Sequence, residues 1–253
     1  QEAAQEVIHG LLTGVERRDR VVRALSGQCG GKLVKEWDGV TIPIVVGNNN
    51  GMDKVQVECN RIKLPYLYID HAYFNRHPQL ERFRLCVSNY HCTDWRDSDK
   101  VPAVKLRDWR IGQGKDVVVI HPAEKVKDVY PVKFWLESTM EALKASTDRK
   151  IILKRKGEGA LADALQNAWS VVCYGSVADV DAVLMGIPAF CGEHSPVWPV
   201  AQHDIALIET PIAVDRAKWL RSLAASEWAL DEISQAWERV KWLLPHIQNC
   251  KQQ

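Results

Sequence analysis

The sequence predicts an α/β protein in which parallel β-strands alternate with helices. Short runs of Val, Ile and Leu are separated by helical patterns of apolar residues, most clearly along residues 42–46, 67–70, 117–120 and 151–153. This alternation is typical of βαβ units, whose strands are buried on both faces of the sheet. With 253 residues, of which 46% are hydrophobic, the chain is long enough for one large or two modest domains.

The first part of the chain predicts one α/β domain over residues 1–110. Apolar residues at mostly helical spacing along residues 1–28 indicate one or two helices, weakened in the middle by Gly10 and Gly14. The expected elements that follow are a strand at 41–46, a polar loop at 47–51, a helix at 52–63, and strands at 67–70 and 83–89. The chain begins with Gln rather than Met, so the sequence leaves open whether this domain continues before residue 1.

The second part predicts another α/β domain over residues 111–215, joined to the first through a polar stretch at 90–105. Its expected elements are a strand at 116–120, a helix at 134–146, a strand at 150–153, a helix at 161–169 and a strand at 171–174. Trp and Leu recur at helical spacing from residue 216 to residue 244. We therefore expect residues 216–253 to form a helical tail that packs across the two domains.

A strand, a tight turn and a capped helix are predicted around Gly175 and Ser176. Gly175 lets the backbone turn without side-chain strain, and Ser176 can cap the next helix together with Asp179 three positions later. Gly186 and Pro188 then end that helix. Such a turn presents free N–H groups and the positive end of a helix dipole at the carboxyl edge of the sheet, where phosphates bind. The alternative is an ordinary, well-capped crossover helix without a ligand.

The pattern Gly-Ser-x-x-x-x-Asp-Ala-x-x-x-Gly-x-Pro along residues 175–188 resembles the nucleotide-sugar half of GT-B glycosyltransferases. The resemblance implies that Ser176 contacts the donor phosphates and that Asp181 contacts the ribose. Together with Tyr-Ile-Asp-His-Ala-Tyr-Phe at residues 68–74, the pattern is similar to a group of phage and bacterial glycosyltransferase-like proteins. Some of these relatives are associated with sugar modification of hydroxymethylated pyrimidines in phage DNA, and non-hydrolysing sugar epimerases share the architecture.

The resemblance implies a GT-B-like fold, with two Rossmann-like parallel-sheet domains that face a cleft. It implies that the protein transfers a hexose or pentose from a nucleotide sugar to a hydroxyl group, with UDP as the expected carrier. It further implies double-stranded phage DNA as the acceptor and the host cytoplasm as the location. A polysaccharide or lipid acceptor, a sugar-nucleotide epimerase, and a non-catalytic module that binds a nucleotide or nucleic acid stay open as alternatives.

Cationic and polar residues that follow the predicted strands of the second domain are the candidates for binding the donor. Lys154, Arg155 and Lys156 lie where a parallel strand ends, and arginine can bind phosphate oxygens with two hydrogen bonds. Because side chains alternate along a strand, we do not expect all three to face one cleft, and Arg155 is preferred. The alternative is a solvated basic strand end. The full set of donor-binding candidates is His121, Lys154, Arg155, Lys156, Gly175, Ser176, Asp181 and His194.

Asp70 and His71 are the candidate catalytic residues, because they lie where a strand gives way to a loop at the edge of an open α/β sheet. A carboxylate beside an imidazole can accept the proton of the acceptor hydroxyl, or can orient the histidine that accepts it, and Asp70 is preferred. The alternative is that Asp70 caps the following loop and His71 packs against it. The acceptor-binding candidates are Tyr73, Arg84, Ser88 and Asn89.

Composition narrows the remaining classes of site. Seven cysteines without a CxxC pair indicate neither a disulfide framework nor a zinc ribbon, and they fit reduced thiols in a cytoplasm. Asp179 and Asp181 spell an Asp-x-Asp metal motif, but both fall in an early helical turn, so we expect neither a metal nor a cofactor besides the nucleotide sugar. A net charge of +1 neither requires nor excludes nucleic acid. No apolar run reaches the roughly 20 residues of a membrane span, and the oligomeric state is not determined by the sequence.

Overall fold

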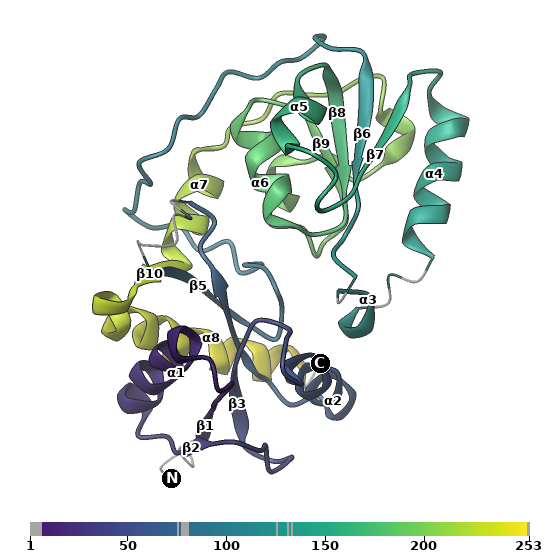
Figure 1. The fold of residues 1–253 in the computed structure, drawn as a ribbon. Coiled ribbons are helices and arrows are strands. Elements are labelled where there is room, and N and C mark those ends of the chain that lie inside the picture. The colour runs from purple at the N-terminus through teal and green to yellow at the C-terminus, as the bar shows by residue number, and fades with distance from the viewer. Residues whose placement is uncertain are drawn as a thin grey trace. The chain divides into compact units, whose positions relative to one another are not determined.

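The chain forms two α/β units, each built around its own sheet (Figure 1). The structure is a computed structural model that describes residues 7–74, 76, 81–124, 126–130, 132 and 134–251, with side chains described up to residue 245. Unit 1 consists of Gln1–Cys92 and Ala225–Gln253, and unit 2 consists of Thr93–Ala224. These boundaries differ from the expected ones at residues 110 and 215, because the polar stretch after Cys92 joins unit 2 and the end of the chain returns to unit 1.

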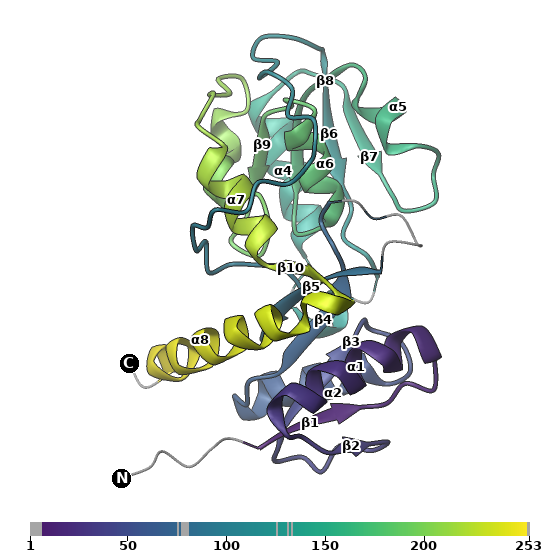
Figure 2. The same ribbon diagram turned by 90° about the vertical axis from the view of Figure 1, so that its left-hand side faces the viewer.

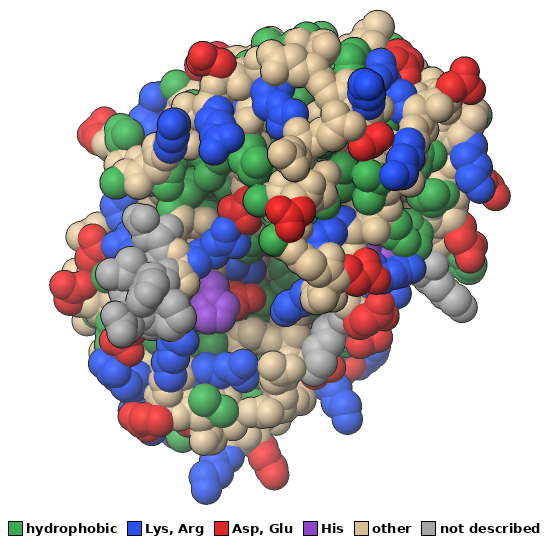
Figure 3. Space-filling view, turned by 45° about the horizontal axis from the view of Figure 1, so that its top comes forward, with side chains coloured by type: hydrophobic (Ala, Val, Ile, Leu, Met, Phe, Trp, Pro, Cys, Tyr) green, Lys and Arg blue, Asp and Glu red, His purple; other side chains and the backbone are tan. Residues whose placement is uncertain are grey.

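Charged side chains of both signs are interspersed on the face of the molecule shown in Figure 3, with hydrophobic side chains between them. This mixture agrees with the near balance of 33 Lys and Arg against 32 Asp and Glu. Among the residues that the structure describes, no helix is both long and apolar enough to cross a membrane.

Six strands form the sheet of unit 1, in the order β10-β5-β4-β3-β1-β2. Strands β1 to β4 are parallel, whereas β5 runs antiparallel to β4, and β10 runs antiparallel to β5. The bounds are β1 Ile8–Leu11, β2 Leu33–Val34, β3 Ile42–Val46, β4 Leu67–His71, β5 Arg82–Val87 and β10 Glu227–Ala229.

The first apolar run is the strand β1, and the prediction of a helix there was wrong. Residue Gly10 within β1 allows helix α1 (Glu16–Cys29) to pack closely, because a Cβ at this position would lie 2.2 Å from Ser26 Oγ and 2.6 Å from Val22 Cγ1. Periodicity cannot distinguish a strand from a helix over so short a run. Pairing with β3 on one side and β2 on the other decides in favour of the strand.

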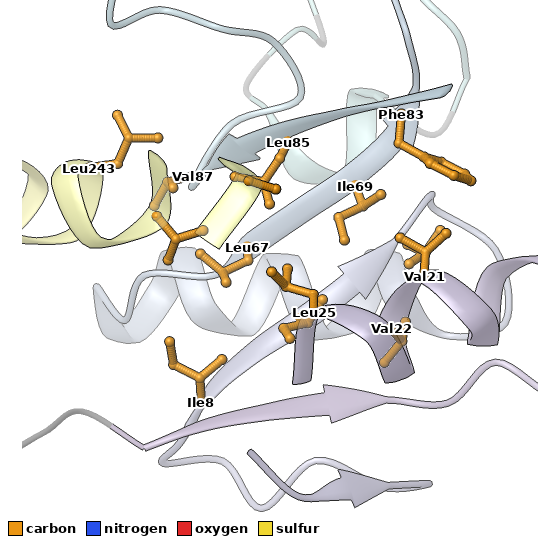
Figure 4. Packing of buried hydrophobic residues seen from close by; sticks show 14 of the residues in the cluster. Ile8, Val21, Val22, Leu25, Leu67, Ile69, Phe83, Leu85, Val87 and Leu243 are labelled. Atoms are coloured by element: carbon orange, nitrogen blue, oxygen red, sulfur yellow. The ribbon is translucent and has the colours of Figure 1, made fainter. Parts of the chain in front are cut away.

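Helices cover both faces of the unit 1 sheet. Helix α1 and helix α8 (Ile233–Lys251) pack together on one face (Figure 2), and α2 (Met52–Ile62) covers the other. Figure 4 shows Val21 and Leu25 of α1 pointing towards Ile69 and Leu67 of β4. Each fully buried side chain of this size stabilises the fold by about 1.5–3 kcal/mol, so the apolar face of α1 is fixed on the sheet.

Four parallel strands form the sheet of unit 2, in the order β7-β6-β8-β9. Helix α4 lies on one face of this sheet, and α5 and α6 lie on the other (Figure 1). The strand bounds are β6 Asp116–Ile120, β7 Ile151–Lys154, β8 Ala168–Cys173 and β9 Ala189–Cys191. The helix bounds are α3 Val126–Val129, α4 Trp135–Ser146, α5 Leu161–Leu165, α6 Val177–Leu184 and α7 Ala217–Ala225, with 3₁₀ turns η2 Trp198–Val200 and η3 Ile205–Leu207.

Side chains alternate between the two faces of the unit 2 sheet. Val119 and Val172 contribute to the core under α4, together with Leu143 of that helix. Val118 and Val171 are fully buried and point to the opposite face, towards α6, because successive strand residues face opposite ways. This double burial explains why the strands appear in the sequence as continuous apolar runs.

The tail after residue 216 does not form one helical segment. Helix α7 belongs to unit 2, β10 then adds an edge strand beside β5, and α8 packs on unit 1 after the 3₁₀ turn η4 (Leu230–Glu232). The strand was missed because Glu227–Ala229 is only three residues long and its Trp228 also fits the helical spacing of the tail.

Both sheets follow the same winding order. In unit 1 the chain passes from β1 outwards to β2 and returns to the other side of β1 with β3, and in unit 2 it passes from β6 to β7 and returns with β8. Each sheet therefore has a topological switch point, between β1 and β3 and between β6 and β8. In open α/β sheets, ligands bind outside the carboxyl ends of the strands at such points.

Candidate active site

The carboxyl edge of the unit 2 sheet brings several predicted donor-binding residues to one side. His121 follows β6, Arg155 follows β7, Ser176 follows β8 and His194 follows β9. His121 and Ser176 flank the switch point, and Arg155 lies on the far side of β6. Neighbouring strands are about 4.8 Å apart, so the ends of β7 and β8 are separated by about 10 Å.

Ser176 caps α6 as the sequence predicts. Its Oγ accepts the N–H of Ala178 at 3.2 Å, and its own N–H donates to Asp179 Oδ2 at 2.9 Å. The helix ends at Gly186, where φ is 80° and a Cβ would lie 1.9 Å from the carbonyl oxygen of Asp108. Within the described part of the chain, the hydroxyl proton of Ser176 and the N–H of Val177 have no partner, so both are available to an anion.

Asp179 joins the cap of α6 to the loop after β9. Its Oδ2 also accepts the Ser195 hydroxyl at 2.8 Å, and Ser195 Oγ accepts the N–H of Val197 at 3.3 Å. The carboxyl is fully buried, and burial raises its pKa to about 7, against the lowering effect of the bonds from Ser195 and Ser176. Its Oδ1 is buried and has no hydrogen-bond partner among the described residues. The nearby Cys173 thiol also lowers the pKa of the carboxyl, but less than Ser195 and Ser176 do. Two loops at the sheet edge therefore depend on one carboxyl group.

The three cations after β7 have different positions. Lys154 is buried, and its Nζ donates to the carbonyl oxygens of Arg155, Glu158 and Gly159 at 3.3, 2.5 and 2.8 Å. The expectation that Lys154 contacts a donor is therefore corrected, because this ammonium group holds the β7–α5 loop together. Arg155 and Lys156 are exposed, and among the residues that the structure describes the Arg155 guanidinium has one loose ion pair, with Glu158, at 3.9 Å between Nε and Oε1. Arg155 keeps donors for a phosphate.

The two histidines of this edge are in different surroundings. His121 Nδ1 lies 2.7 Å from the Pro122 carbonyl oxygen, an arrangement in which Nδ1 carries the proton and Nε2 is left as an acceptor. The His194 ring lies 4.8 Å from the Tyr130 ring and 5.6 Å from the Tyr174 ring, measured between centroids. Burial lowers the pKa of His194, so it is a neutral, aromatic part of the edge.

A pocket of about 330 Å³ opens beside β8 and β9, on the face of the sheet that α4 covers. Val172 and Phe190 form its floor. Trp198 and His203 form a wall, with their rings stacked at 3.3 Å between centroids and 8° between planes. An aromatic wall of this kind is suited to a flat ring.

In unit 1, three charged side chains lie side by side on one face of the sheet. Asp70 of β4 is the cross-strand partner of Arg84 of β5, which is in turn the partner of Glu227 of β10. Arg84 is only 4% exposed, and its Nη2 lies 3.3 Å from Asp70 Oδ2. Glu227 Oε2 accepts the N–H groups of Tyr73 and Phe74 at 2.7 and 3.1 Å. Glu227 therefore fixes the loop that follows Asp70 and His71.

Asp70 has donors on both carboxylate oxygens. Oδ2 accepts the Tyr68 hydroxyl at 2.7 Å as well as Arg84, and Oδ1 accepts the N–H of His71 at 2.8 Å. Burial alone would raise the pKa of Asp70, but Arg84, the Tyr68 hydroxyl and the His71 N–H lower it below its ordinary value. The side chain of His71 is exposed beside it. Asp70 is thus held as a carboxylate, whereas the imidazole next to it is open to solvent.

The predicted acceptor-binding residues are mostly occupied within unit 1. Arg84 donates to the carbonyl oxygens of Tyr90 and His71, and the Tyr73 hydroxyl accepts the N–H of Cys92 at 2.8 Å. Both side chains are buried, which leaves them little surface for contact with an acceptor. Ser88 has a left-handed φ of 54°, its Oγ accepts the N–H of Tyr66, and Asn89 Oδ1 accepts the N–H of His91, each at 3.4 Å. These bonds shape the turn after β5.

Sequence reasoning missed three parts of these sites: the bond from Ser195 to Asp179, the stacked Trp198–His203 pair, and the position of Glu227 beside Arg84. Asp179 was considered as a helix cap and as part of an Asp-x-Asp motif, and its raised pKa results from burial, which one sequence does not report. Glu227 was hidden because the β10 strand was not predicted. A usable signal was the charged Glu227 beside Trp228 in an otherwise apolar stretch, since a buried charge implies a partner.

No known protein family matches the sequence, and no curated protein matches it. Among solved structures, the chain is similar to Thermosulfurimonas dismutans KpsC, beta Kdo 2,7 transferase, with a TM-score of 0.52 and 12% identity over 93% of this chain and 99% of that chain. It is also similar to Thermosulfurimonas dismutans KpsC, beta Kdo 2,4 transferase, with a TM-score of 0.45 and 11% identity over 89% of this chain and 92% of that chain. At such low identity the first likeness shows the fold alone, and the second supports no argument. The predicted fold class is confirmed: the chain is an α/β protein with two parallel-sheet units and a GT-B-like fold.

Proposed function

We propose that this protein is a glycosyltransferase that binds an activated sugar at the carboxyl edge of the unit 2 sheet and transfers the sugar to a hydroxyl group of a saccharide. The observation that carries the proposal is the Ser176 turn, which places an available hydroxyl and the free N–H of Val177 at the switch point of a GT-B-like sheet. The solved structure with the higher TM-score is that of a beta Kdo 2,7 transferase, and a sugar as the transferred group agrees with this likeness.

The donor phosphates need compensation of negative charge, which becomes larger as the bond to the sugar breaks. Ser176 Oγ would donate one hydrogen bond, the N–H of Val177 a second, and the guanidinium of Arg155 a charge-assisted third. The positive end of the α6 dipole adds to this field. The pocket walled by Trp198 and His203 is the proposed position of the nucleobase, because base–aromatic stacking tolerates every base.

His71, rather than Asp70, is the proposed general base. A carboxylate whose pKa is lowered by Arg84 and two hydrogen bonds is a poor proton acceptor, because an efficient base has a pKa near the working pH. The His71 imidazole beside it is exposed and can reach an acceptor hydroxyl from solvent. The role left to Asp70 is to hold the backbone of His71 in place through the bond from the His71 N–H to Oδ1.

A saccharide acceptor is preferred to a base in DNA. The expectation of a DNA acceptor came from the resemblance, and Arg84 and Tyr73, two of the predicted acceptor-binding residues, are buried. On the face shown in Figure 3, acidic side chains are mixed with the basic ones. Binding to DNA draws most of its affinity from clustered cations that neutralise phosphates, and this face offers no wide single-sign area.

Hydrolysis of the donor in the absence of acceptor tests the proposal. The protein is incubated with nucleotide sugars that carry each of the common bases, and release of the nucleotide is measured. We expect Ser176→Ala and Arg155→Ala to reduce release by about 10- to 100-fold, as for hydrogen bonds to charged groups, and Lys144→Ala, an exposed change on α4, to have no effect. Release that is equal in all variants contradicts the proposed donor site, and binding without any release or transfer identifies a binding module.

A further inference from the structure

A second pocket, in unit 1, has no part in the assignments made so far. It measures about 330 Å³ and opens between the segment after β2 and the start of α2. This volume is at the lower end of the range for small-molecule sites, about 300–1,000 Å³. Its walls lie next to the carboxyl ends of β1 and β3, at the switch point of the unit 1 sheet, where a ligand is expected from topology alone.

The loops around this pocket are fixed without a ligand. Asn50 Nδ2 donates to the carbonyl oxygen of Thr13 at 3.0 Å, which ties the loop after β3 to the loop after β1. The Asp19 carboxylate accepts the N–H groups of Thr13 and Gly14 at 2.7 and 3.0 Å. The polar loop at residues 47–51, which the donor site does not explain, is thus part of a preformed wall, and binding there costs little conformational entropy.

Trp37 provides the aromatic surface of the pocket. Its indole N–H donates to the carbonyl oxygen of Thr41 at 2.8 Å, which fixes the ring. The Asp38 carboxylate accepts the N–H groups of Val40 and Thr41 and the Thr41 hydroxyl, and these bonds lower the pKa of Asp38. The turn after Trp37 is therefore rigid, and the indole keeps its orientation with its hydrogen bond already made.

The charged groups of the pocket balance each other. Lys35 and Lys54 can donate hydrogen bonds, and Glu36 and Glu58 can accept them. Glu58 is paired with Arg61 at 2.5 Å, whereas Lys35, Glu36 and Lys54 have no ion pair within the part of the chain that the structure describes. A phosphate would be attracted by the lysines and repelled by Glu36. A neutral ring with many hydroxyl groups satisfies both kinds of side chain.

We infer that this pocket binds a saccharide ring, with the apolar face of the ring against Trp37 and its hydroxyl groups bonded to Glu36, Lys54 and Asn50. Aromatic side chains offer a flat apolar surface to such a face. Carboxylates accept hydrogen bonds from the hydroxyl groups of a sugar. The binding itself does not require catalysis. The identification of this saccharide as the acceptor of the transferase rests on the function proposed above.

Nuclear magnetic resonance on the full chain tests this inference with simple probes. The indole N–H resonance of Trp37 is identified as the one that is lost in Trp37→Phe. Methyl glycosides of glucose, galactose, mannose and N-acetylglucosamine are then added to about 50 mM. This concentration allows dissociation constants in the millimolar range to be detected. We expect at least one glycoside to shift the Trp37 resonance in proportion to occupancy. The Trp95 resonance, identified by Trp95→Phe, serves as the control and is expected to stay in place.

Variants at exposed positions separate the saccharide from an anion. Glu36→Gln and Lys54→Gln are expected to weaken glycoside binding by about 2- to 10-fold each, the usual value of one hydrogen bond, whereas Lys144→Gln has no effect. Binding should persist at about 0.5 M NaCl, where charges are screened within a few ångströms. The inference is overturned if no glycoside moves the Trp37 resonance, or if inorganic phosphate moves it and salt abolishes the effect.

Donor hydrolysis distinguishes this inference from the proposed function. Glu36→Gln and Lys54→Gln should release nucleotide from the donor at the wild-type rate without acceptor, because neither residue belongs to unit 2. If the wild-type protein neither binds nor hydrolyses any nucleotide sugar, the proposed function fails, and the shift of the Trp37 resonance still decides the pocket. If hydrolysis is intact and no glycoside binds, the inference alone fails.

Discussion

Asp179 should make the stability of unit 2 depend on pH near neutrality. Its pKa is raised from 3.8 to about 7 by burial, so between these values the folded protein binds a proton that the unfolded chain does not. The free energy of unfolding therefore falls as pH rises through this window and is level above about pH 7. Each unit of pKa difference corresponds to about 1.36 kcal/mol, so the loss between pH 5 and pH 7, where the group is half ionised, is about 2 kcal/mol.

Asp179→Asn is the informative perturbation. The amide oxygen can still accept the bonds from Ser176 and Ser195, and the side chain no longer ionises. We expect the difference in unfolding free energy between this variant and the wild type to grow in favour of the variant by about 2 kcal/mol from pH 5 to pH 7. Asp179→Ala leaves two buried donors without a partner and should cost about 2–5 kcal/mol at pH 5.

Urea unfolding followed by tryptophan fluorescence at several pH values measures these differences. Asp163→Asn is the matched control, because it makes the same change at an exposed position of α5 in the same unit. The control should show no comparable dependence on pH. A constant difference between Asp179→Asn and the wild type from pH 5 to pH 8, or the same slope in Asp163→Asn, would refute the account of this carboxyl group.

Three further predictions, the first with its own control variant, test other parts of the structure by thermal and urea unfolding. Gly10→Ala should destabilise unit 1 by about 1–3 kcal/mol, because the new Cβ would contact Ser26 and Val22. The control Gly27→Ala has open space around its Cβ and should stabilise α1 by up to about 1 kcal/mol. Equal effects of the two substitutions would argue against β1 packing under α1. Gly186→Ala should cost more than about 2 kcal/mol, because φ is 80° and the Asp108 carbonyl oxygen lies 1.9 Å from the new Cβ; a neutral result would contradict the end of α6. Arg84→Met should destabilise the fold by about 3–5 kcal/mol, because Asp70 loses its buried ionic partner. The pKa of Asp70, measured by NMR titration of the carboxyl group, should rise. An unchanged pKa would show that Arg84 does not lower the pKa of Asp70.

The sequence was sufficient for the regular parts of the fold. Continuous apolar runs such as Asp116–Ile120 were correctly assigned as strands, because burial on both faces of a parallel sheet requires apolar residues at successive positions. The cap at Ser176 was also predictable, since Ser and Asp three positions apart satisfy local backbone groups. Short elements were not predictable. β1 and β10 take their conformation from neighbouring strands rather than from their own few residues.

The candidate site was predictable in its position and not in its contacts. Strands that alternate with helices are expected to be parallel, which brings their carboxyl ends, and with them His121, Arg155 and Ser176, to one sheet edge. Burial decided the rest: Lys154 turns inwards to three carbonyl oxygens, and Arg84 is enclosed between Asp70 and two carbonyl oxygens. A single sequence does not report which cations are enclosed in this way, because the same residue types also occur on solvated strand ends.

The central claim is that the Ser176 turn binds the phosphates of an activated sugar, and Val177→Pro tests it most directly. Proline is tolerated at the first position of a helix and removes only the N–H group, and Ser176 has the extended backbone that proline requires before it, with ψ 154°. Isothermal titration of a nucleoside diphosphate should show binding to the wild type and about 10-fold weaker binding to the variant, with unchanged thermal stability. Equal affinity of the two proteins, or no binding to either, would contradict the account.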